Sequence, residues 1–338
     1  MSNVEFPKAA SEGLVSIVIP TYRADEYIGQ ALASISRQEY RHWELIVVED
    51  ASQGRTEGIV REFARNHSQH RVVYLRNEKN SGPSHSRNVA FQQAQGEFVA
   101  LLDADDRWLS EHLAASVAAL QGTQADLAYS SVVVIEDQTE LLLGMWGPTQ
   151  EELDDFPHGL FTRNFITPSA TVFRRSVIAD VGLWSVSLRL CEDLDYWLRC
   201  LREKKRFAHV GGCHCLYRQN RPEAATKNKC AVQEGVASVA ERYIGLPGTR
   251  LRTCRNRAGK AFVQAARFHY KADGKMDPSR DLRKIAPLLL KAWKLRPKRV
   301  DYLLRSGWWS LLNFLSKPAP PPAQLPVSLQ SVPIRKAA

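Results

Sequence analysis

Short β-rich runs alternate with segments of helical spacing through the first hundred residues, and this alternation limits the possible folds more than any other feature. The apolar runs occupy residues 15–19, 44–49, 72–75 and 98–102. Between them, the apolar spacing predicts helices over residues 27–36, 57–65 and 84–95. Repeated β-α-β units of this length predict an α/β fold, a mostly parallel sheet with helices on both faces.

Polar residues follow three of these predicted strands at the point where each strand ends. Thr21 and Tyr22 follow the first strand, Glu49 and Asp50 end the second, and an acidic turn at residues 103–106 follows the fourth. Ligands of open parallel sheets bind outside the carboxyl ends of the strands. These polar residues are therefore expected to meet along one rim of the sheet.

The acidic turn Asp103-Ala104-Asp105-Asp106 is the first candidate for chemistry. Two carboxylates one residue apart can hold a hard divalent cation that also binds a diphosphate. Mg²⁺ or Mn²⁺ would neutralise negative charge on a departing nucleotide, acting as a Lewis acid. An Asp-x-Asp pair alone is most often a solvated turn, and its position directly after a buried strand favours the metal interpretation.

Three residues at the rim have both a functional and a structural interpretation. A carboxylate at Glu49 or Asp50 accepts hydrogen bonds from a base or ribose, or it serves as the N-cap of the next helix. Tyr22 packs against a base, or it covers the edge of the sheet. Local pattern alone leaves both pairs of alternatives open.

A second acidic pair, Glu192 and Asp193, begins a predicted helix over residues 192–201. The helix dipole favours carboxylates at this end, which is a purely structural reason for them. The functional alternative is a general base that takes the proton of an acceptor hydroxyl.

Five segments make the chain resemble the family 2 glycosyltransferases, which have the GT-A fold. They read VSIVIPTY at 15–22, WELIVVEDAS at 43–52, NSGPSHSRN at 80–88, GEFVALLDADD at 96–106 and EDLDYWLR at 192–199. Tyr217-Arg218 extends the match. The resemblance covers residues 14–220 in the order and spacing of the family.

The resemblance implies a role for each matching position. The residues implied to bind a nucleotide sugar are Pro20, Thr21, Tyr22, Glu49, Asp50, Arg87, Asp103 and Ala104. Asp50 would contact the base, and Asp103 and Asp105 would bind Mn²⁺ or Mg²⁺, Asp105 as the direct ligand. Asp193 would deprotonate the acceptor hydroxyl for one inverting displacement, with Glu192 and Trp197 on the acceptor side.

The sequence departs from the family pattern at two places. Glu49-Asp50 stands where two aspartates are common, which lengthens the first carboxylate and keeps Asp50. Asn220 stands soon after Tyr217-Arg218, where many members have a histidine, so no metal ligand is predicted in that segment.

The resemblance and the composition together predict three parts. Residues 12–222 form a GT-A catalytic domain, residues 223–316 a basic helical extension, and residues 317–338 a Pro-rich disordered tail. The predicted function is transfer of a sugar, as in hexosyltransferases, from a UDP-linked or similar donor to a glycan or lipid-linked acceptor in cell-envelope polysaccharide or glycolipid synthesis. The alternative is a non-catalytic sugar- or membrane-binding protein of the same fold, which would be expected to lack Asp105 or Asp193.

The charge of the chain is unevenly distributed. The net charge is +10, yet residues 241–338 hold 21 basic and 5 acidic residues, whereas residues 1–240 hold 25 basic and 31 acidic ones. A basic tail favours an anionic partner. Residues 298–315 place Val300, Leu304 and Trp308 on one helical face and basic residues opposite, a pattern typical both of an interfacial helix and of a helix packed on the domain.

Other features exclude or weaken several classes. The longest apolar runs are far shorter than the ~20 residues that span a bilayer, and the first ten residues lack a secretory pattern, so we expect a cytoplasmic protein, peripheral on the membrane. The six cysteines predict reduced thiols. The first strand is followed by no Gly-x-Gly-x-x-Gly turn, against a dehydrogenase, and no Gly-rich basic loop, against a nucleotidyltransferase. The acidic rim disfavours a nucleic-acid partner.

Overall fold

A computed structural model describes residues 11–221, 227–270 and 282–315, and it has the predicted α/β architecture. One sheet has the strand order β3-β2-β1-β4-β8-β6-β9-β5, and β7 pairs with β6. Its strands are β1 (Ser11–Thr21), β2 (Trp43–Glu49), β3 (Val72–Arg76), β4 (Gly96–Leu101), β5 (Arg107–Trp108), β6 (Leu127–Glu136), β7 (Leu142–Trp146), β8 (Thr171–Arg174) and β9 (Phe207–Gln219).

The first four strands are mutually parallel, as the β-α-β pattern predicts. β1 pairs with β2 and with β4, and β2 pairs with β3, all in parallel. β8 runs antiparallel to β4 and β6, and β9 runs parallel to β6. The carboxyl ends of β1, β2 and β4 therefore meet at one edge of the sheet, which is where the polar rim was expected.

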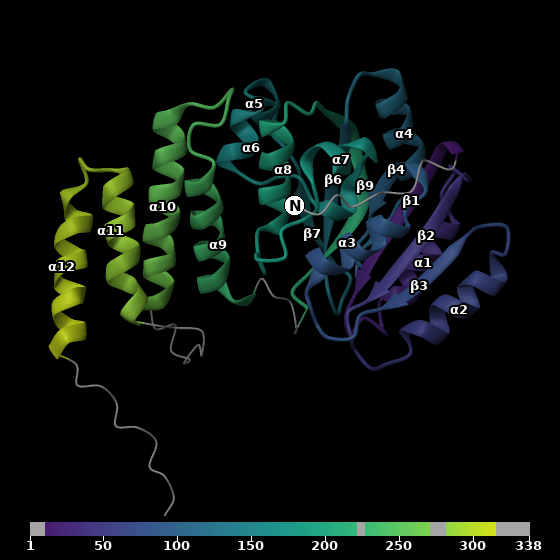
Figure 1. The fold of residues 1–338 in the computed structure, drawn as a ribbon, viewed down its shortest axis with the longest axis horizontal. Coiled ribbons are helices and arrows are strands. Elements are labelled where there is room, and N and C mark those ends of the chain that lie inside the picture. Colours follow the sequence, from purple (N-terminus) through teal and green to yellow (C-terminus); the bar gives the residue numbers. More distant parts are fainter. Residues whose placement is uncertain (1–10, 222–226, 271–281, 316–338) are drawn as a thin grey trace, which may run out of the picture.

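Helices cover both faces of this sheet (Figure 1). They are α1 (Ile28–Ser36), α2 (Thr56–Asn66), α3 (Pro83–Gln93), α4 (His112–Gly122), α5 (Gln150–Asp154), α6 (His158–Thr162), α7 (Ser176–Val181) and α8 (Glu192–Arg202). β1 shows how the two faces are filled. Ile17 and Ile19 join one apolar core with Ile28 of α1, whereas Val18 joins a second core with Phe91 of α3.

The entry to α3 depends on one glycine. Gly82 has a φ of +88°, a conformation that residues with a Cβ rarely adopt, and Pro83 follows at the start of the helix. The turn sets the direction of α3, so that Arg87, in the second turn of the helix, is buried against the rim.

Four helices, α9 (Lys229–Arg242), α10 (Leu251–Tyr270), α11 (Ile285–Leu295) and α12 (Val300–Leu315), with a 3-10 turn at Leu282–Lys284, stack beside α8 (Figure 1). The buried Asp195 of α8 accepts hydrogen bonds from Arg242 at 2.9 Å and from the Tyr243 hydroxyl at 3.0 Å. The extension is helical, as predicted. The predicted boundary at 222–223 and the predicted tail at 317–338 lie outside the described residues.

Local features explain the extent of two strands. A 3-10 turn, Pro168–Ala170, precedes β8, because Pro168 has no N–H for a ladder and suits the first position of a turn. The strand β9 has thirteen residues and pairs with β6 along nearly its whole length.

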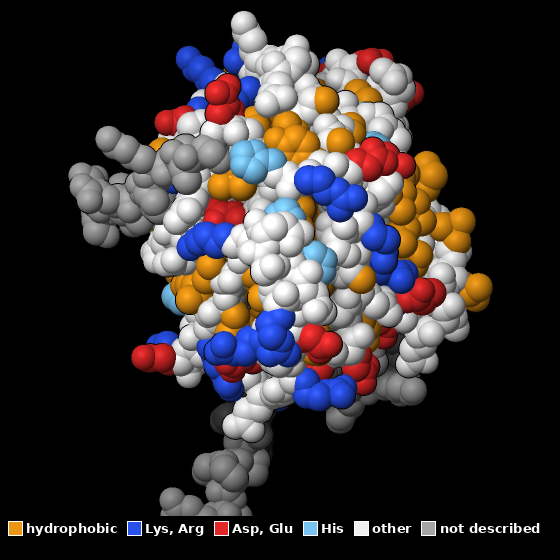
Figure 2. Space-filling view, turned by 90° about the vertical axis from the view of Figure 1, so that its right-hand side faces the viewer, with side chains coloured by type: hydrophobic (Ala, Val, Ile, Leu, Met, Phe, Trp, Pro, Cys, Tyr) orange, Lys and Arg blue, Asp and Glu red, His pale blue; other side chains and the backbone are white. Residues whose placement is uncertain are grey.

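Two further observations concern the distribution of charged side chains on the surface and the lengths of the helices. At the end of the molecule opposite the α9–α12 stack, Lys and Arg side chains are interspersed with Asp and Glu (Figure 2). Among the described residues, no helix combines the length and the apolarity required to cross a membrane.

Candidate active site

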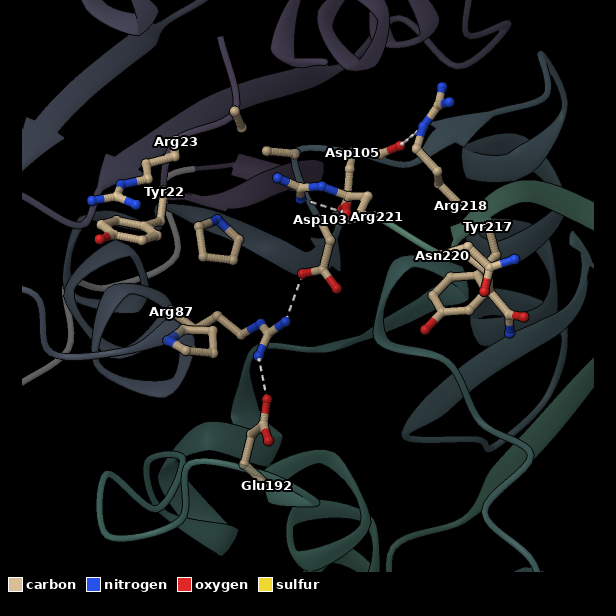
Figure 3. Close-up of a pocket in the computed structure, with 15 residues that line it drawn as sticks. Tyr22, Arg23, Arg87, Asp103, Asp105, Glu192, Tyr217, Arg218, Asn220 and Arg221 are labelled. Carbon is tan, nitrogen blue, oxygen red and sulfur yellow. Dashed lines mark hydrogen bonds and ion pairs between the residues drawn. The ribbon is translucent and has the colours of Figure 1, made fainter. Parts of the chain in front are cut away.

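A cleft of about 780 Å³ opens at the carboxyl edge of the sheet (Figure 3). Segments from the ends of β1, β4 and β9 and from the starts of α3 and α8 supply its walls. Its lining includes Pro20, Tyr22, Arg87, Asp103, Ala104, Asp105, Glu192 and Arg221. The start of α8 therefore lies beside the residues that follow the first and fourth predicted strands.

Buried hydrogen bonds hold the acidic turn in place. Asp106 accepts a hydrogen bond from the Ser169 hydroxyl at 2.5 Å and another from the Arg218 backbone N–H at 2.9 Å. The Ser169 oxygen in turn accepts the backbone N–H of Asp103 at 3.0 Å. Burial, together with the charges of Asp105 and Asp103, raises the pKa of Asp106 well above its usual value. Asp106 thus fixes the turn, and the other two carboxylates face the cleft.

Each of those two carboxylates is paired with an arginine. Arg87 Nη2 donates to Asp103 Oδ1 at 2.6 Å, and Arg221 Nη1 donates to Asp105 Oδ2 at 2.7 Å. Burial and the neighbouring Asp103 charge raise the pKa of Asp105, and Arg221 opposes that shift. A cation beside each carboxylate therefore offsets the repulsion between their negative charges.

The donor set fits a Mg²⁺ or Mn²⁺ that is shared with a ligand. One oxygen of Asp103 and one of Asp105 accept the arginines, which leaves a second oxygen on each side chain at the cleft. Mg²⁺ is usually held by one or two carboxylates plus waters and substrate phosphates. Among the described residues no cluster of three or more His, Cys, Asp or Glu side chains is arranged for a metal.

A second hollow of about 310 Å³ adjoins the cleft and shares Pro20, Tyr22 and Pro83 with it. Two hydroxyls in its wall, Thr21 Oγ1 and Ser84 Oγ, are buried and have no hydrogen-bond partner within the described part of the chain. A buried hydroxyl without a partner costs about 1–3 kcal/mol. A polar ring such as a nucleobase is the kind of ligand that would satisfy both.

Asp50 lies in the wall of this second hollow and organises it. Its carboxylate accepts the backbone N–H groups of Ser81 and Gly82, at 2.9 and 2.7 Å, and the amide of Asn77 at 2.8 Å. Asp50 therefore joins the end of β2 to the entry of α3. The neighbouring Glu49 accepts the Ser52 hydroxyl and lines neither hollow.

The acidic pair begins α8, as expected. Cys191 before it has a φ of +60°, an uncommon conformation for a residue with a side chain, and it turns the chain so that Glu192 faces the cleft. Glu192 Oε1 lies 3.6 Å from Arg87 Nη1. Burial, reinforced by the Asp193 charge, raises the pKa of Glu192 to about 7.

Asp193 lies behind Glu192 and is not part of the cleft wall. Its Oδ2 accepts the Asn164 amide at 2.7 Å, and its Oδ1 accepts the Leu194 backbone N–H at 2.7 Å. Burial raises the pKa of Asp193. Trp197, which was expected on the acceptor side, does not line the cleft: it is fully buried and donates its indole N–H to the Ile166 carbonyl at 3.2 Å.

Several contacts at the site come from residues that the sequence did not single out. Arg221 pairs with Asp105, Ser169 supports the acidic turn, and Asn164 holds Asp193. Ser169 and Asn164 lie outside the five segments that carry the family resemblance. Arg221 has no local signal, because 116 residues separate it from Asp105.

Comparisons with known proteins show the family of the chain. The family described as Glycosyl transferase family 2 matches residues 16–182. TuaG of Bacillus subtilis, named for teichuronic acid biosynthesis, is 31% identical over 205 residues, covering 60% of this chain and 77% of that protein. WfgD of Escherichia coli, named as a UDP-Glc:alpha-D-GlcNAc-diphosphoundecaprenol beta-1,3-glucosyltransferase, is 33% identical over 126 residues, covering 37% of this chain and 48% of that protein. This chain thus matches about half of WfgD.

Solved structures resemble the fold. TarS of S. aureus in complex with UDP-GlcNAc has a TM-score of 0.64 at 17% identity, covering 88% of this chain and 92% of that chain. The mannosyltransferase PcManGT of Pyrobaculum calidifontis, in complex with GDP-Man and Mn²⁺, has a TM-score of 0.58 at 18% identity, covering 91% and 89%. The fold is the GT-A fold, and since TuaG matches over three quarters of its own length, the chain belongs to the family 2 glycosyltransferases and is a glycosyltransferase enzyme.

Proposed function

We propose that the protein transfers a sugar from a nucleoside-diphosphate sugar, UDP-linked rather than GDP- or dTDP-linked, to an acceptor hydroxyl with inversion at the anomeric carbon. The acceptor is a glycan or a lipid-linked glycan of cell-envelope synthesis, the context in which TuaG and WfgD are named. Residues 12–222 form the catalytic domain in this proposal, and residues 223–316 form the helical extension.

One observation carries the proposal: the two adjoining hollows match the two halves of a nucleoside diphosphate. The smaller hollow offers the unpartnered Thr21 and Ser84 hydroxyls to a base or ribose. The larger cleft offers Asp103 and Asp105 for a divalent cation and Arg87 and Arg221 for negative charge. A UDP-sugar would span both, with its sugar towards Glu192.

The reaction follows from the charges around the cleft. A bound Mg²⁺ or Mn²⁺ supplies Lewis-acid stabilisation of the leaving diphosphate. Asp103 and Asp105 would hold it, and the arginines would add positive charge where negative charge develops. The acidic pair opposite would take the proton of the acceptor hydroxyl. We assign that step to Asp193, and Glu192, which faces the cleft, would orient the acceptor.

The stereochemistry of slow donor hydrolysis tests the proposal without knowledge of the acceptor. Purified protein would be incubated with an α-linked UDP-sugar and Mn²⁺, and the released sugar would be followed by NMR before it mutarotates. Initial release of the β-anomer supports a single displacement. Initial release of the α-anomer would exclude the inverting reaction.

We further propose that the extension attaches the enzyme to the cytoplasmic face of a membrane. At the α11–α12 turn and the start of α10, a hollow of about 460 Å³ is lined by the cations Arg252, Arg255, Arg296, Lys298 and Arg299, without a carboxylate in its described lining. Along α12, Val300, Leu304 and Trp308 are 53%, 69% and 61% exposed, whereas Tyr302 and Ser306 pack inward. Basic residues beside an exposed Leu and Trp stripe suit an anionic lipid surface.

The non-catalytic alternative has less support. A protein that only binds a sugar would have no need for Asp105 at the cleft or for the acidic pair at α8, and the chain has all of these residues.

A further inference from the structure

Arg221 is a candidate for a role that the family resemblance does not give it. It directly follows Asn220, in the segment where the sequence lacks the histidine that many family members have. Its guanidinium donates to Asp105 at 2.7 Å, and the two side chains are only 17% and 21% exposed. An ion pair with this little solvent is stronger than a surface pair. Arg221 therefore holds the carboxylate proposed to bind the cation (Figure 3).

The aromatic ring of Tyr27 supports the guanidinium of Arg221 beside Asp105. The guanidinium lies 4.5 Å from the centre of the Tyr27 ring, within the range of a cation–π interaction. The Tyr27 hydroxyl donates to Asp137 at 3.2 Å, which fixes the ring. Arg221 is thus positioned by an aromatic platform, and Asp105 is the one carboxylate to which it bonds in the described part of the chain.

The two arginines that pair with the acidic turn differ in how tightly their surroundings hold them. Arg87 is 3% exposed, stacks on the Trp184 ring at 4.6 Å and lies between Asp103 and Glu192. Its position is fixed from several sides. Arg221 also lines the cleft, but its side chain is 17% exposed, and in the described part of the chain its one carboxylate partner is Asp105.

Repulsion between like charges would displace Arg221 when a cation enters the cleft. A divalent ion on Asp105 would lie close to the guanidinium that bonds the same carboxylate, and the two would repel each other. A diphosphate in the cleft removes this conflict, because a guanidinium binds phosphate oxygens with two parallel hydrogen bonds.

We propose that Arg221 neutralises Asp105 in the donor-free enzyme and moves to the donor diphosphate when the cation binds, so that cation and nucleotide bind cooperatively. This inference rests on the proposed metal–diphosphate site. It makes Arg221 a positioning residue that opposes binding of the cation alone and favours binding of the cation together with the donor.

The test measures Mn²⁺ binding, by the electron paramagnetic resonance signal of free Mn²⁺, with and without UDP. Wild-type protein, Arg221→Gln and Arg221→Lys would be compared with Arg61→Gln, which removes an arginine paired with Glu57 on the surface of α2. Arg221→Gln is expected to bind Mn²⁺ alone at least ~5-fold tighter than wild type, and the factor by which UDP tightens Mn²⁺ binding should fall at least ~5-fold. Arg221→Lys keeps the charge and should stay near wild type for Mn²⁺ alone.

The outcomes separate this inference from the proposed function. If Arg221→Gln binds Mn²⁺ alone no tighter than wild type, or if UDP tightens Mn²⁺ binding equally in both, the role of Arg221 is wrong while the site stands. If wild-type protein binds neither Mn²⁺ nor UDP, the proposed metal–diphosphate site fails, and the inference fails with it. Arg61→Gln should match wild type in every titration.

Discussion

Arg87 donates to Asp103 at 2.6 Å, and the same guanidinium lies 3.6 Å from Glu192, so a single buried side chain connects the acidic turn to the start of α8. Arg87 comes from α3, Asp103 from the turn after β4 and Glu192 from the start of α8. One guanidinium therefore links three elements that are distant in sequence.

Removal of that charge should cost stability as well as donor binding. Arg87→Gln leaves two partly buried carboxylates without a cation, and breaking a buried pair typically costs about 3–5 kcal/mol. Arg87→Lys keeps a charge and should lose less than half as much. Urea unfolding followed by circular dichroism measures both; equal losses for the two variants would mean that shape rather than charge matters at this position.

The base assignment predicts a specific split between turnover and binding. Asp193→Asn should lower kcat by about 10²–10⁴-fold, because the acceptor proton loses its base, and should change the dissociation constant of UDP by less than about 3-fold. Asp180→Asn is the matched control, since Asp180 is an exposed aspartate of α7 whose partner, Lys205, lies beyond the end of α8. Near-normal kcat in Asp193→Asn, together with a large loss in Glu192→Gln, would transfer the role of base to Glu192.

The acidic pair also predicts a pH dependence. Burial and Asp193 raise the pKa of Glu192 to about 7, so the pair gains a proton as the pH falls through that value, and kcat/KM should fall with it. Glu192→Gln removes one of two like charges and should move the acidic limb to lower pH. A limb that stays in place would show that other groups control it.

The same pKa makes a prediction for stability with the opposite trend. A carboxyl whose pKa is raised by folding binds its proton more tightly in the folded state, so its favourable contribution at low pH is lost as the pH rises through about 7. Glu192→Gln should therefore raise the melting temperature at about pH 8 more than at about pH 5. An equal effect at both values would argue against a raised pKa.

Membrane attachment should depend both on the exposed apolar side chains of α12 and on the basic hollow beside it. Leu304→Ser with Trp308→Ser should reduce co-sedimentation with vesicles that contain phosphatidylglycerol, and Arg252→Gln with Arg255→Gln should make the remaining binding less sensitive to salt. The matched control replaces Arg61, which lies on α2, outside the extension. Unchanged sedimentation of both double variants would exclude this surface.

Period and position along the chain were enough to predict the parallel strands and the rim. The apolar runs ended within two residues of the ends of β1, β2 and β4, and carboxyl ends of parallel strands must share an edge, so Tyr22, Asp50 and Asp103 were expected together. Trp197 and Arg221 show the limit of this approach. Helical spacing placed Trp197 beside the acidic pair without saying that it points into the core, and the approach of β9 to the acidic turn brings Arg221 to Asp105 across 116 residues.

The sequence could not predict which face of α12 is covered, for a related reason. Both an interfacial helix and a packed helix have one apolar face, and only the position of α11 decides which side is covered. Ser306 donates to the Ala286 carbonyl of α11 at 2.9 Å, which turns Leu304 and Trp308 outward.

Metal-dependent transfer from a nucleotide sugar can be measured as nucleotide release from a panel of UDP-, GDP- and dTDP-sugars, with Mn²⁺ or Mg²⁺ and with EDTA. We expect slow release from one UDP-sugar, abolished by EDTA and lowered at least ~100-fold in Asp105→Asn. Absence of release from every donor together with absence of metal-dependent donor binding, or release that neither EDTA nor Asp105→Asn affects, would contradict it.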